Sequence, residues 1–507
     1  MIMKLGLTSA IKSFNLFNLQ LSADSSEALC KTISSCTNLQ SLDLEYITLH
    51  DSVLDINRLA SLTYLRLQDV TMSIECTKYL CRSISNCTNL QFLNLQNIKL
   101  YDSMLDLGKL MGLTSLKLWN VTMSCEFSES LCKSISNHIH LQTLHDSIID
   151  LSRLTHLINL TLWSVTMSGE CIESLCRCIS NCTNLRTLHL DCITLHDTVL
   201  HLSRLTDLST LRLWQLNMSI ECSRSLCRSI STCTRLQSLH LIIMTLHDSI
   251  LDLNILTSLT DFVLWDVTMS SECSESLCRS ISNCTHLQNL DLQEITLHDG
   301  VLDLSRLTGL TKLELRSITI SSECSRSLCR SISNCTHLQN LDLQEITLHD
   351  GVLDPSRLTG LTKLELRSVT MSSECSESLC RSISNCTHLQ NLDLQEITLH
   401  DGVLDLSRLT GLTNLKQKNI TMSSECSNTL YRSIHNCVRM QALHLEQITL
   451  HDSILDLSTF TNMTNLVIMG VRMSSPCHQV LNTSVKALPS LLLCKTEGLM
   501  VSADSHN

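Results

Sequence analysis

The strongest constraint on the fold is an internal repeat of 51 residues. The dipeptide His-Asp marks it, starting at residues 196, 247, 298, 349, 400 and 451, with 51 residues between successive copies. Earlier copies of this position are His50, Tyr101 and His145. The last step is 44 residues (145 − 101), so the third copy is shorter than the others. Self-similarity at a fixed period along nearly the whole chain predicts a solenoid rather than a string of globular domains.

Each unit divides into two leucine-rich halves. In the sixth copy, the motif L-x-x-L-x-L begins at Leu287, recurs 23 residues later at Leu310, and recurs again 28 residues later at Leu338. Because side chains alternate along a strand, each motif predicts a short strand with its leucines facing inward. The 28-residue half has room for a helix over 322–334, with apolar residues spaced by four and Asn334 as a left-handed stop.

These halves predict an α/β solenoid shaped like a horseshoe. About nineteen short parallel strands should line its concave face, and alternating long and short helical elements its convex face. We expect residues 1–487 to form this solenoid, as nine double repeats after an N-terminal half repeat. Residues 488–507 are its C-terminal end, with room for a last strand and a disordered tail. The first residues carry no polar cap, which favours a fragment of a longer protein.

Two positions break the pattern. The shortened third copy at 141–149 leaves only a stub of strand, which predicts a kink or a soft point. Gln417 occupies a position that leucine fills elsewhere, so a polar group is expected to face the core there.

The 28 cysteines follow the repeat, and a typical unit has three, such as Cys324, Cys329 and Cys335. Equivalent cysteines recur only on every second strand, roughly 10 Å apart, which is too far for a disulfide. They are therefore interpreted as small buried apolar residues. No C-x-x-C pair points to a metal site. The lack of disulfides and of a signal-peptide pattern before residue 10 favours the reducing cytoplasm.

Enzyme signatures are missing. The sequence has no phosphate-binding glycine loop, no H-E-x-x-H and no G-x-S-x-G, so we expect neither catalytic residues nor a cofactor. The repeated His-Asp suits a turn better than a single active site. A net charge of −12 argues against nucleic acid and anionic membrane surfaces, and no apolar run is long enough to span a membrane.

The concave face carries the candidate binding residues. The last outward position of the strands in successive 28-residue halves is Trp119, Trp163, Trp214, Trp265, Arg316, Arg367 and Lys418. All four tryptophans of the chain thus share one register. Either their rings pack on neighbouring strands, or they form a stripe that binds a protein, since Trp and Arg dominate interface energies. His189 and His240 flank the tryptophans, and Glu314 and Glu365 flank the arginines.

The segment 328–343, with the sequence L-C-R-S-I-S-N-C-T-H-L-Q-N-L-D-L, resembles the ribonuclease-inhibitor-like subclass of leucine-rich repeats. The resemblance covers about residues 7–480. It is most similar to the leucine-rich tail of intracellular nucleotide-binding, leucine-rich-repeat receptors (NLRs) of invertebrates. One departure is an apolar residue, such as Ile295 or Ile318, where most leucine-rich repeats have Asn or Cys.

The resemblance implies a non-enzymatic, cytoplasmic protein-binding module of an innate immune receptor. In that family the tail senses ligand and restrains a nucleotide-binding oligomerisation module, which would lie upstream of this chain. One alternative is a free-standing cytosolic adaptor or enzyme inhibitor, such as ribonuclease inhibitors and some ubiquitin-ligase adaptors. Another is an extracellular recognition receptor of the toll-like kind.

Overall fold

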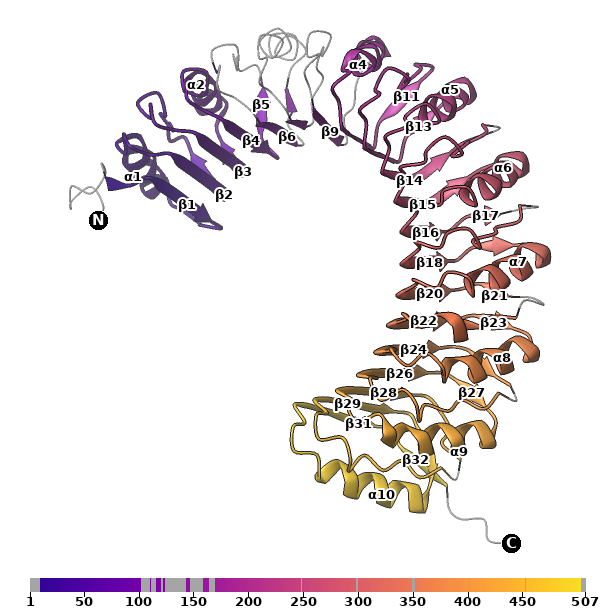
Figure 1. Cartoon of the computed structure of the whole chain (residues 1–507). Coiled ribbons are helices and arrows are strands. Elements are labelled where there is room, and N and C mark those ends of the chain that lie inside the picture. The colour runs from indigo at the N-terminus through magenta and orange to yellow at the C-terminus, as the bar shows by residue number, and fades with distance from the viewer. Residues whose placement is uncertain are drawn as a thin grey trace. The chain divides into compact units, whose positions relative to one another are not determined.

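A computed structural model of the 507-residue chain describes residues 10–101, 110, 115–119, 122–123, 143–145, 158–163, 169–247, 249–297, 300–348, 352–400, 402–451 and 453–502. The chain divides into two compact units, Met1–Thr245 (unit 1) and Leu246–Asn507 (unit 2). In both, parallel strands line one side and helices line the other (Figure 1).

Unit 1 is built on parallel strands, each paired with the next along the sequence. They are β1 (Ser13–Phe17), β2 (Ser41–His50), β3 (Tyr64–Met72), β4 (Phe92–Gln96), β6 (Ser115–Trp119), β8 (Thr143–His145), β9 (Asn159–Trp163), β10 (Thr187–Asp191), β12 (Thr210–Trp214) and β14 (Ser238–Thr245). Shorter strands pair behind them, β5 (Lys99–Tyr101) with β7 (Thr122–Met123) and β11 (Thr194–His196) with β13 (Asn217–Met218).

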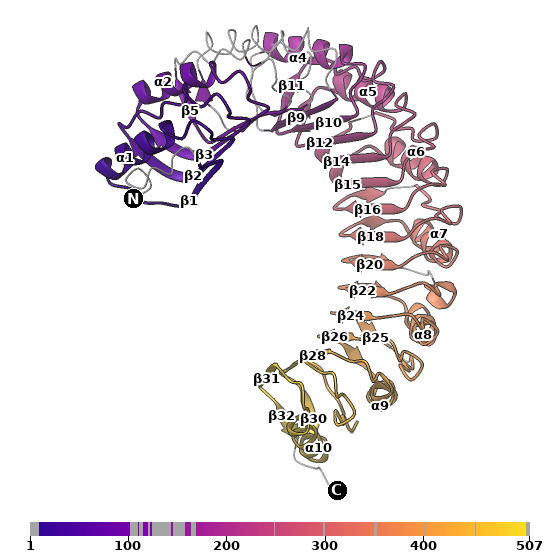
Figure 2. The ribbon, with the colours of Figure 1, turned by 60° about the vertical axis from the view of Figure 1, so that its left-hand side comes forward.

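Unit 2 repeats the same arrangement (Figure 2). Its strands are β15 (Asp261–Thr268), β16 (Asn289–Gln293), β18 (Lys312–Arg316), β20 (Asn340–Gln344), β22 (Lys363–Arg367), β24 (Asn391–Gln395), β26 (Asn414–Lys418), β28 (Ala442–Glu446), β29 (Asn465–Met469) and β31 (Leu493–Glu497). Two-stranded pairs behind them are β17 (Thr296–Leu297) with β19 (Thr319–Ile320), β21 (Thr347–Leu348) with β23 (Thr370–Met371), β25 (Thr398–Leu399) with β27 (Thr421–Met422), and β30 (Arg472–Ser474) with β32 (Met500–Ser502).

The helices belong to the 28-residue halves. They are α1 (Ala23–Ser34), α2 (Ile74–Ile84), α4 (Gly169–Asn181) and α5 (Ile220–Ile230) in unit 1, and α6 (Ser271–Ile281), α7 (Ser322–Ile332), α8 (Ser373–Ile383), α9 (Ser424–Ser433) and α10 (Ser475–Lys486) in unit 2. The predicted left-handed stop at Asn334 is wrong. Helix α7 ends at Ile332, Ser333 is right-handed, and Asn334 donates its backbone N–H to the Ser331 carbonyl at 3.0 Å.

The 23-residue halves carry turns where a short helical element was expected. The 3₁₀ turn η4 (Pro355–Arg357) follows Asp354, whose side chain accepts a hydrogen bond from the Ser356 backbone N–H. In the 28-residue half of α9, a different 3₁₀ turn, η5 (Ile434–Asn436), directly follows the helix.

In many of the described halves a left-handed residue lies directly after the five-residue strand. Glu294, Ser317 and Glu345, with φ of 50° or 51°, are examples. Their backbone N–H groups donate to the last carbonyl of the next strand, as Glu294 does to Arg316 at 2.9 Å. The apolar residue that follows, such as Ile295 at 3% exposure, is buried. Backbone hydrogen bonds between neighbouring halves therefore take the place of the buried Asn or Cys side chains that most leucine-rich repeats use here.

The described cysteines form no disulfide with one another, and nearly all are buried. The third cysteine of a unit links two layers, because its thiol points at a carbonyl of the preceding 23-residue half. Cys335 Sγ lies 3.6 Å from the Leu304 oxygen, and Cys386 Sγ lies 3.5 Å from the Pro355 oxygen. Burial raises the pKa of Cys335 and Cys386 to about 12, so these thiols are poor nucleophiles.

The inward Gln417 has a specific partner. Its side chain is fully buried and its Oε1 accepts a 2.7 Å hydrogen bond from the hydroxyl of Tyr431, which is also fully buried. Tyr431 stands on α9 at the position that Cys380 occupies on α8. The polar residue in the leucine position is thus hydrogen-bonded to a polar residue of helix α9.

The shortened third copy is described only at β8, which pairs with β6 and β9 through three residues each. The predicted kink at 141–149 otherwise lies outside the described residues. Stacked strand–turn–helix units in both parts confirm the α/β solenoid class that the repeat predicts.

Candidate protein-binding surface

The outward residues of the strands form three columns. In strands such as β12, β18 and β22 the second and fourth side chains are buried, and the first, third and fifth are partly exposed. Asp191 on β10 and Asp342 on β20 are outward residues that are buried. Because neighbouring strands pair in register, these positions align across the sheet. We call them the first, middle and last columns.

The middle column of unit 2 carries a carboxylate on each of five neighbouring strands. These residues are Asp291, Glu314, Asp342, Glu365 and Asp393, aligned from β16 to β24. Like charges this close repel one another, so the column requires compensation.

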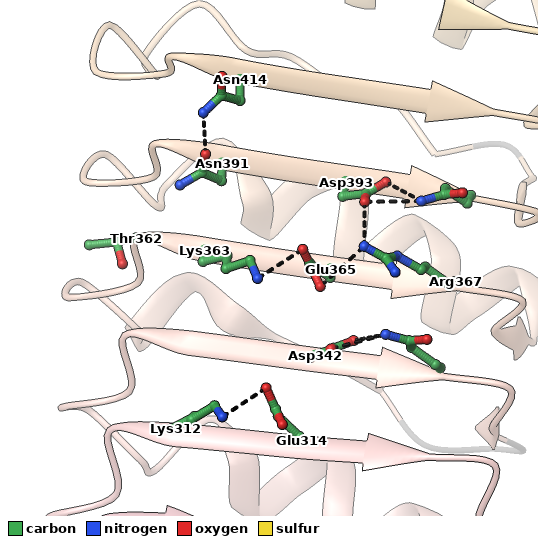
Figure 3. A network of polar contacts seen from close by, with 12 residues as sticks. Lys312, Glu314, Asp342, Thr362, Lys363, Glu365, Arg367, Asn391, Asp393 and Asn414 are labelled. Carbon is green, nitrogen blue, oxygen red and sulfur yellow. Dashed lines mark hydrogen bonds and ion pairs between the residues drawn. The ribbon is translucent and has the colours of Figure 1, made fainter. Parts of the chain in front are cut away.

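Cations from the flanking columns supply it (Figure 3). Lys363 Nζ lies 2.9 Å from Glu365, and Arg367 bridges Glu365 at 3.4 Å and Asp393 at 2.8 Å. Gln395 adds hydrogen bonds from its Nε2 to both oxygens of Asp393. We call this set, with its equivalents in the preceding repeat, the charge ladder.

The preceding repeat has the same pattern. Arg316 pairs with Asp342 at 2.7 Å and with Glu314 at 3.3 Å, and Lys312 pairs with Glu314 at 3.0 Å. Further along, Lys418 pairs with Glu446 at 3.0 Å. The predicted binding residues Arg316, Arg367 and Lys418 are therefore half-buried cations with their charge compensated inside the sheet.

The charge ladder is incomplete at Asp291. Arginines precede Asp342 and Asp393 in the last column of the neighbouring strand, whereas Trp265 precedes Asp291. The indole Nε1 of Trp265 instead donates to Glu294 at 3.1 Å. Burial, and then the repulsion of Glu314, raise the pKa of Asp291, against the hydrogen bond from Gln293 and the charge of Arg316.

In unit 1 the last column holds Trp119, Trp163 and Trp214 at the ends of β6, β9 and β12. The side chains of Trp119 and Trp163 lie outside the described part of the chain. Trp214 is half-buried, and Arg212 Cζ lies 5.2 Å from the centroid of its ring. Its ring therefore packs on a neighbour and also keeps an exposed part.

Three nitrogen-bearing side chains occupy the middle column beside Trp214. His189, Arg212 and His240 align on β10, β12 and β14. Asp191, two residues after His189, is 4% exposed, and burial raises its pKa while the nearby Arg212 lowers it. Burial, then Arg212 and His240, lower the pKa of His189. We call these five residues, including Trp214, the Arg212 cluster.

The sequence placed His189, His240, Glu314 and Glu365 beside the tryptophan–arginine stripe, and the structure places all four in the middle column. Arg212 and Asp191 were missed, because only the last column of the 28-residue halves was followed. Reading the middle position across consecutive halves would have found Arg212, and reading the last position of the 23-residue halves would have found Asp191. Within the described residues, no group of His, Cys, Asp and Glu is arranged to hold a metal ion.

Comparison with known proteins agrees with this geometry. No family model matches the chain. A leucine-rich-repeat protein of Leptospira interrogans superposes with a TM-score of 0.54 at 18% identity, over 87% of this chain and 97% of that one. The complex of TLR13 with ssRNA13 gives a TM-score of 0.49 at 17% identity, over 98% of this chain and 73% of that one. The strand–turn–helix repeat and the match to the Leptospira interrogans protein define the fold as that of a leucine-rich-repeat protein.

One curated protein is similar to this chain in sequence. Protein NLRC5 of Ictalurus punctatus is 26% identical over 183 residues, which are 33% of this chain and 10% of that protein. The chain therefore matches only a small part of the relative's length. It is a leucine-rich-repeat protein that resembles the leucine-rich-repeat part of an NLR.

Proposed function

We propose that the chain is the ligand-sensing leucine-rich-repeat part of an intracellular innate immune receptor, and that it binds a protein through its strand-lined face. In this proposal it is not an enzyme, it acts in the cytoplasm, and a nucleotide-binding module that it restrains lies upstream. Residues 1–487 act as one solenoid domain, and 488–507 form its end. The similarity to NLRC5 supports the receptor class.

The observation that carries the binding role is the contrast between two parts of the strand surface. In unit 2 the cations of the last column are paired with carboxylates, as Arg367 is with Asp393. In the Arg212 cluster, a half-buried guanidinium lies against Trp214, and its buried Nε has no hydrogen-bond partner among the described residues. Trp and Arg residues in partly desolvated sites carry much of the energy of protein interfaces.

The binding role is tested with the double variant Trp163→Ala/Trp214→Ala of the full chain. It is expected to weaken binding to the native protein partner by at least about 2 kcal/mol. Arg279→Ala is the matched control, because this helix residue is largely exposed and pairs with Glu275 on the same helix. If the double variant binds normally but melts at a lower temperature, the tryptophans serve packing and this proposal fails.

The receptor class is tested by reading the transcript from its 5′ end. A reading frame that continues upstream into a phosphate-binding G-x-x-x-x-G-K-[ST] loop is the expected result. A stop codon directly before Met1 would contradict the receptor assignment and leave a free-standing adaptor or inhibitor.

Among the described residues, no helix is long and apolar enough to cross a bilayer.

A further inference from the structure

Arginines in the middle column of unit 1 differ in their partners. Arg66 on β3 forms ion pairs with Glu45 and, at 3.5 Å, with Asp43, both on β2. Arg212 occupies the equivalent place on β12, but its in-register neighbours are His189 and His240. Two positions that are alike in the repeat thus differ in whether a carboxylate of the chain compensates the cation.

The Arg212 cluster contains hydrogen-bonding capacity that the protein does not use. The Nε of Arg212 and the Oδ1 of Asp191 are buried and have no hydrogen-bond partner. A buried donor or acceptor without a partner costs about 1–3 kcal/mol. Native proteins retain few such groups. A carboxylate ligand would supply the acceptor that Arg212 Nε lacks, whereas the Asp191 oxygen is itself an acceptor.

The chemistry of the cluster fits a carboxylate. Its guanidinium presents paired N–H donors that match the two oxygens of a carboxylate. His189 and His240 lie on the neighbouring strands, about 4.8 Å to either side. His189 adds ring nitrogens to the site, whereas the Nε2 of His240 already contacts Ser238 Oγ at 3.1 Å. Asp191 competes only weakly with such a carboxylate for Arg212. Among the described contacts Asp191 makes no ion pair with Arg212, and burial raises the pKa of Asp191.

The charge of the site also separates two kinds of anionic partner. Binding to a nucleic-acid backbone requires several cations, one for each phosphate neutralised. The cluster offers one permanent cation, two histidines and Asp191, whose pKa is raised by burial. Burial, then Arg212 and His240, lower the pKa of His189. A single carboxylate matches this charge, and the ring of Trp214 adds an aromatic surface for the residues that flank it.

We propose that the Arg212 cluster is the anchor point for a protein partner and binds an aspartate or glutamate side chain of an acidic segment. The inference rests on the proposed protein-binding function and names the chemistry that its partner must have. Neither the repeat pattern nor the similarity to NLRC5 assigns this site.

The test uses fluorescence anisotropy with the full chain and three labelled probes: oligoglutamate, oligoglutamine of the same length, and single-stranded oligouridine. We expect oligoglutamate to bind more tightly than the other two. Arg212→Gln should weaken its binding at least about tenfold, as loss of a charge-assisted hydrogen bond predicts. Arg66→Gln is the control, and it should leave binding unchanged because Arg66 is already paired.

Arg212→Lys keeps the charge but loses the paired donors, and it serves as the second variant if Arg212→Gln fails to fold. We expect it to give a smaller loss of oligoglutamate binding. Equal binding of oligoglutamate and oligoglutamine, or equal losses from the Arg66 and Arg212 variants, would overturn the proposal. Tighter, Arg212-dependent binding of oligouridine would overturn the choice of a carboxylate.

Failure here is distinguishable from failure of the proposed function. If the native partner still loses affinity in Trp163→Ala/Trp214→Ala but oligoglutamate does not bind, the surface binds protein by other chemistry. If neither the probe nor the partner responds, the strand-lined face is not the binding surface.

Discussion

Gln417 shows how a single residue that breaks the pattern is accommodated. A buried amide in a leucine position would cost several kcal/mol without a hydrogen-bond partner. Tyr431 supplies one for its oxygen at 2.7 Å, and the Nε2 of Gln417 remains without a partner. The sequence marks Gln417 as unusual, but it does not show that the residue 14 positions later is its partner.

Tyr431→Phe is therefore expected to destabilise the fold by about 1–3 kcal/mol, because it leaves the buried Gln417 oxygen unsatisfied. Gln417→Leu/Tyr431→Phe should recover much of this loss, since both polar groups are then gone. Urea unfolding of the two single variants and the double variant measures the coupling. Additive effects would show that the hydrogen bond does not contribute.

Asp291 provides a pH test at the same scale. Its pKa in the folded protein is raised above 3.8, so the folded state holds a proton that the unfolded state has already released. Its favourable contribution is present below pH 3.8 and is lost as pH rises through the folded pKa. Asp291→Asn should therefore stabilise the protein at neutral pH and lose this advantage in acid.

Asp342→Asn is the matched control for this prediction, because Asp342 is the equivalent residue of the next repeat but has its arginine at 2.7 Å. It should cost about 1.5–3 kcal/mol at neutral pH, the value of a hydrogen bond to a charged group. Thermal unfolding at neutral and acid pH compares the two. Equal destabilisation by both variants would show that Arg316 does not distinguish these carboxylates.

At the scale of elements, the leucine spacing predicts the strands and their inward faces. At the start of α7, Ser321 caps the helix, accepting from the Cys324 N–H at 3.2 Å. The end of the helix is not predicted correctly, because the turn closes through 3₁₀-type bonds such as Cys335 N–H to the Ile332 carbonyl. A left-handed residue is not needed there.

The left-handed turn after each strand gives an element-scale prediction. Gly470 takes this position with φ of 60°, and an added Cβ would lie 3.3 Å from Cγ of Gln447. Gly470→Ala is expected to cost about 1–2 kcal/mol, the penalty of this conformation for an L-residue.

Gly309→Ala is the control, because a Cβ there would meet its nearest atom, the Leu287 carbonyl oxygen, at 3.9 Å. The shift in the urea midpoint measures both variants. A similar midpoint for the two would contradict the role given to the left-handed turn.

The candidate surface was predictable in part. The register of the strands places the tryptophans and arginines in one column from the sequence alone. The compensation of Arg316 by Asp342 is not visible there, because it joins residues 26 positions apart on neighbouring strands. For the same reason the sequence did not reveal the contrast between Arg66 and Arg212, which depends on whether the neighbouring strands place a carboxylate beside each arginine.

At the scale of the whole molecule, the cysteines test the proposed compartment. Alkylation under non-reducing, denaturing conditions should modify essentially all 28 cysteines, because the described ones are free thiols. Mass spectrometry of the intact alkylated chain counts them. Several protected pairs would indicate an oxidising compartment and would contradict the cytoplasmic proposal.

The central claim is that the chain binds a protein through its strand-lined face. Its most direct test places a photo-crosslinking amino acid at Thr187, in the first column of β10, or at Arg177, on the exposed side of α4, in the native cells. The account predicts a protein crosslink from position 187 that disappears with Arg212→Gln, and none from position 177. Crosslinks from position 177 alone would place the partner on the helices and contradict it.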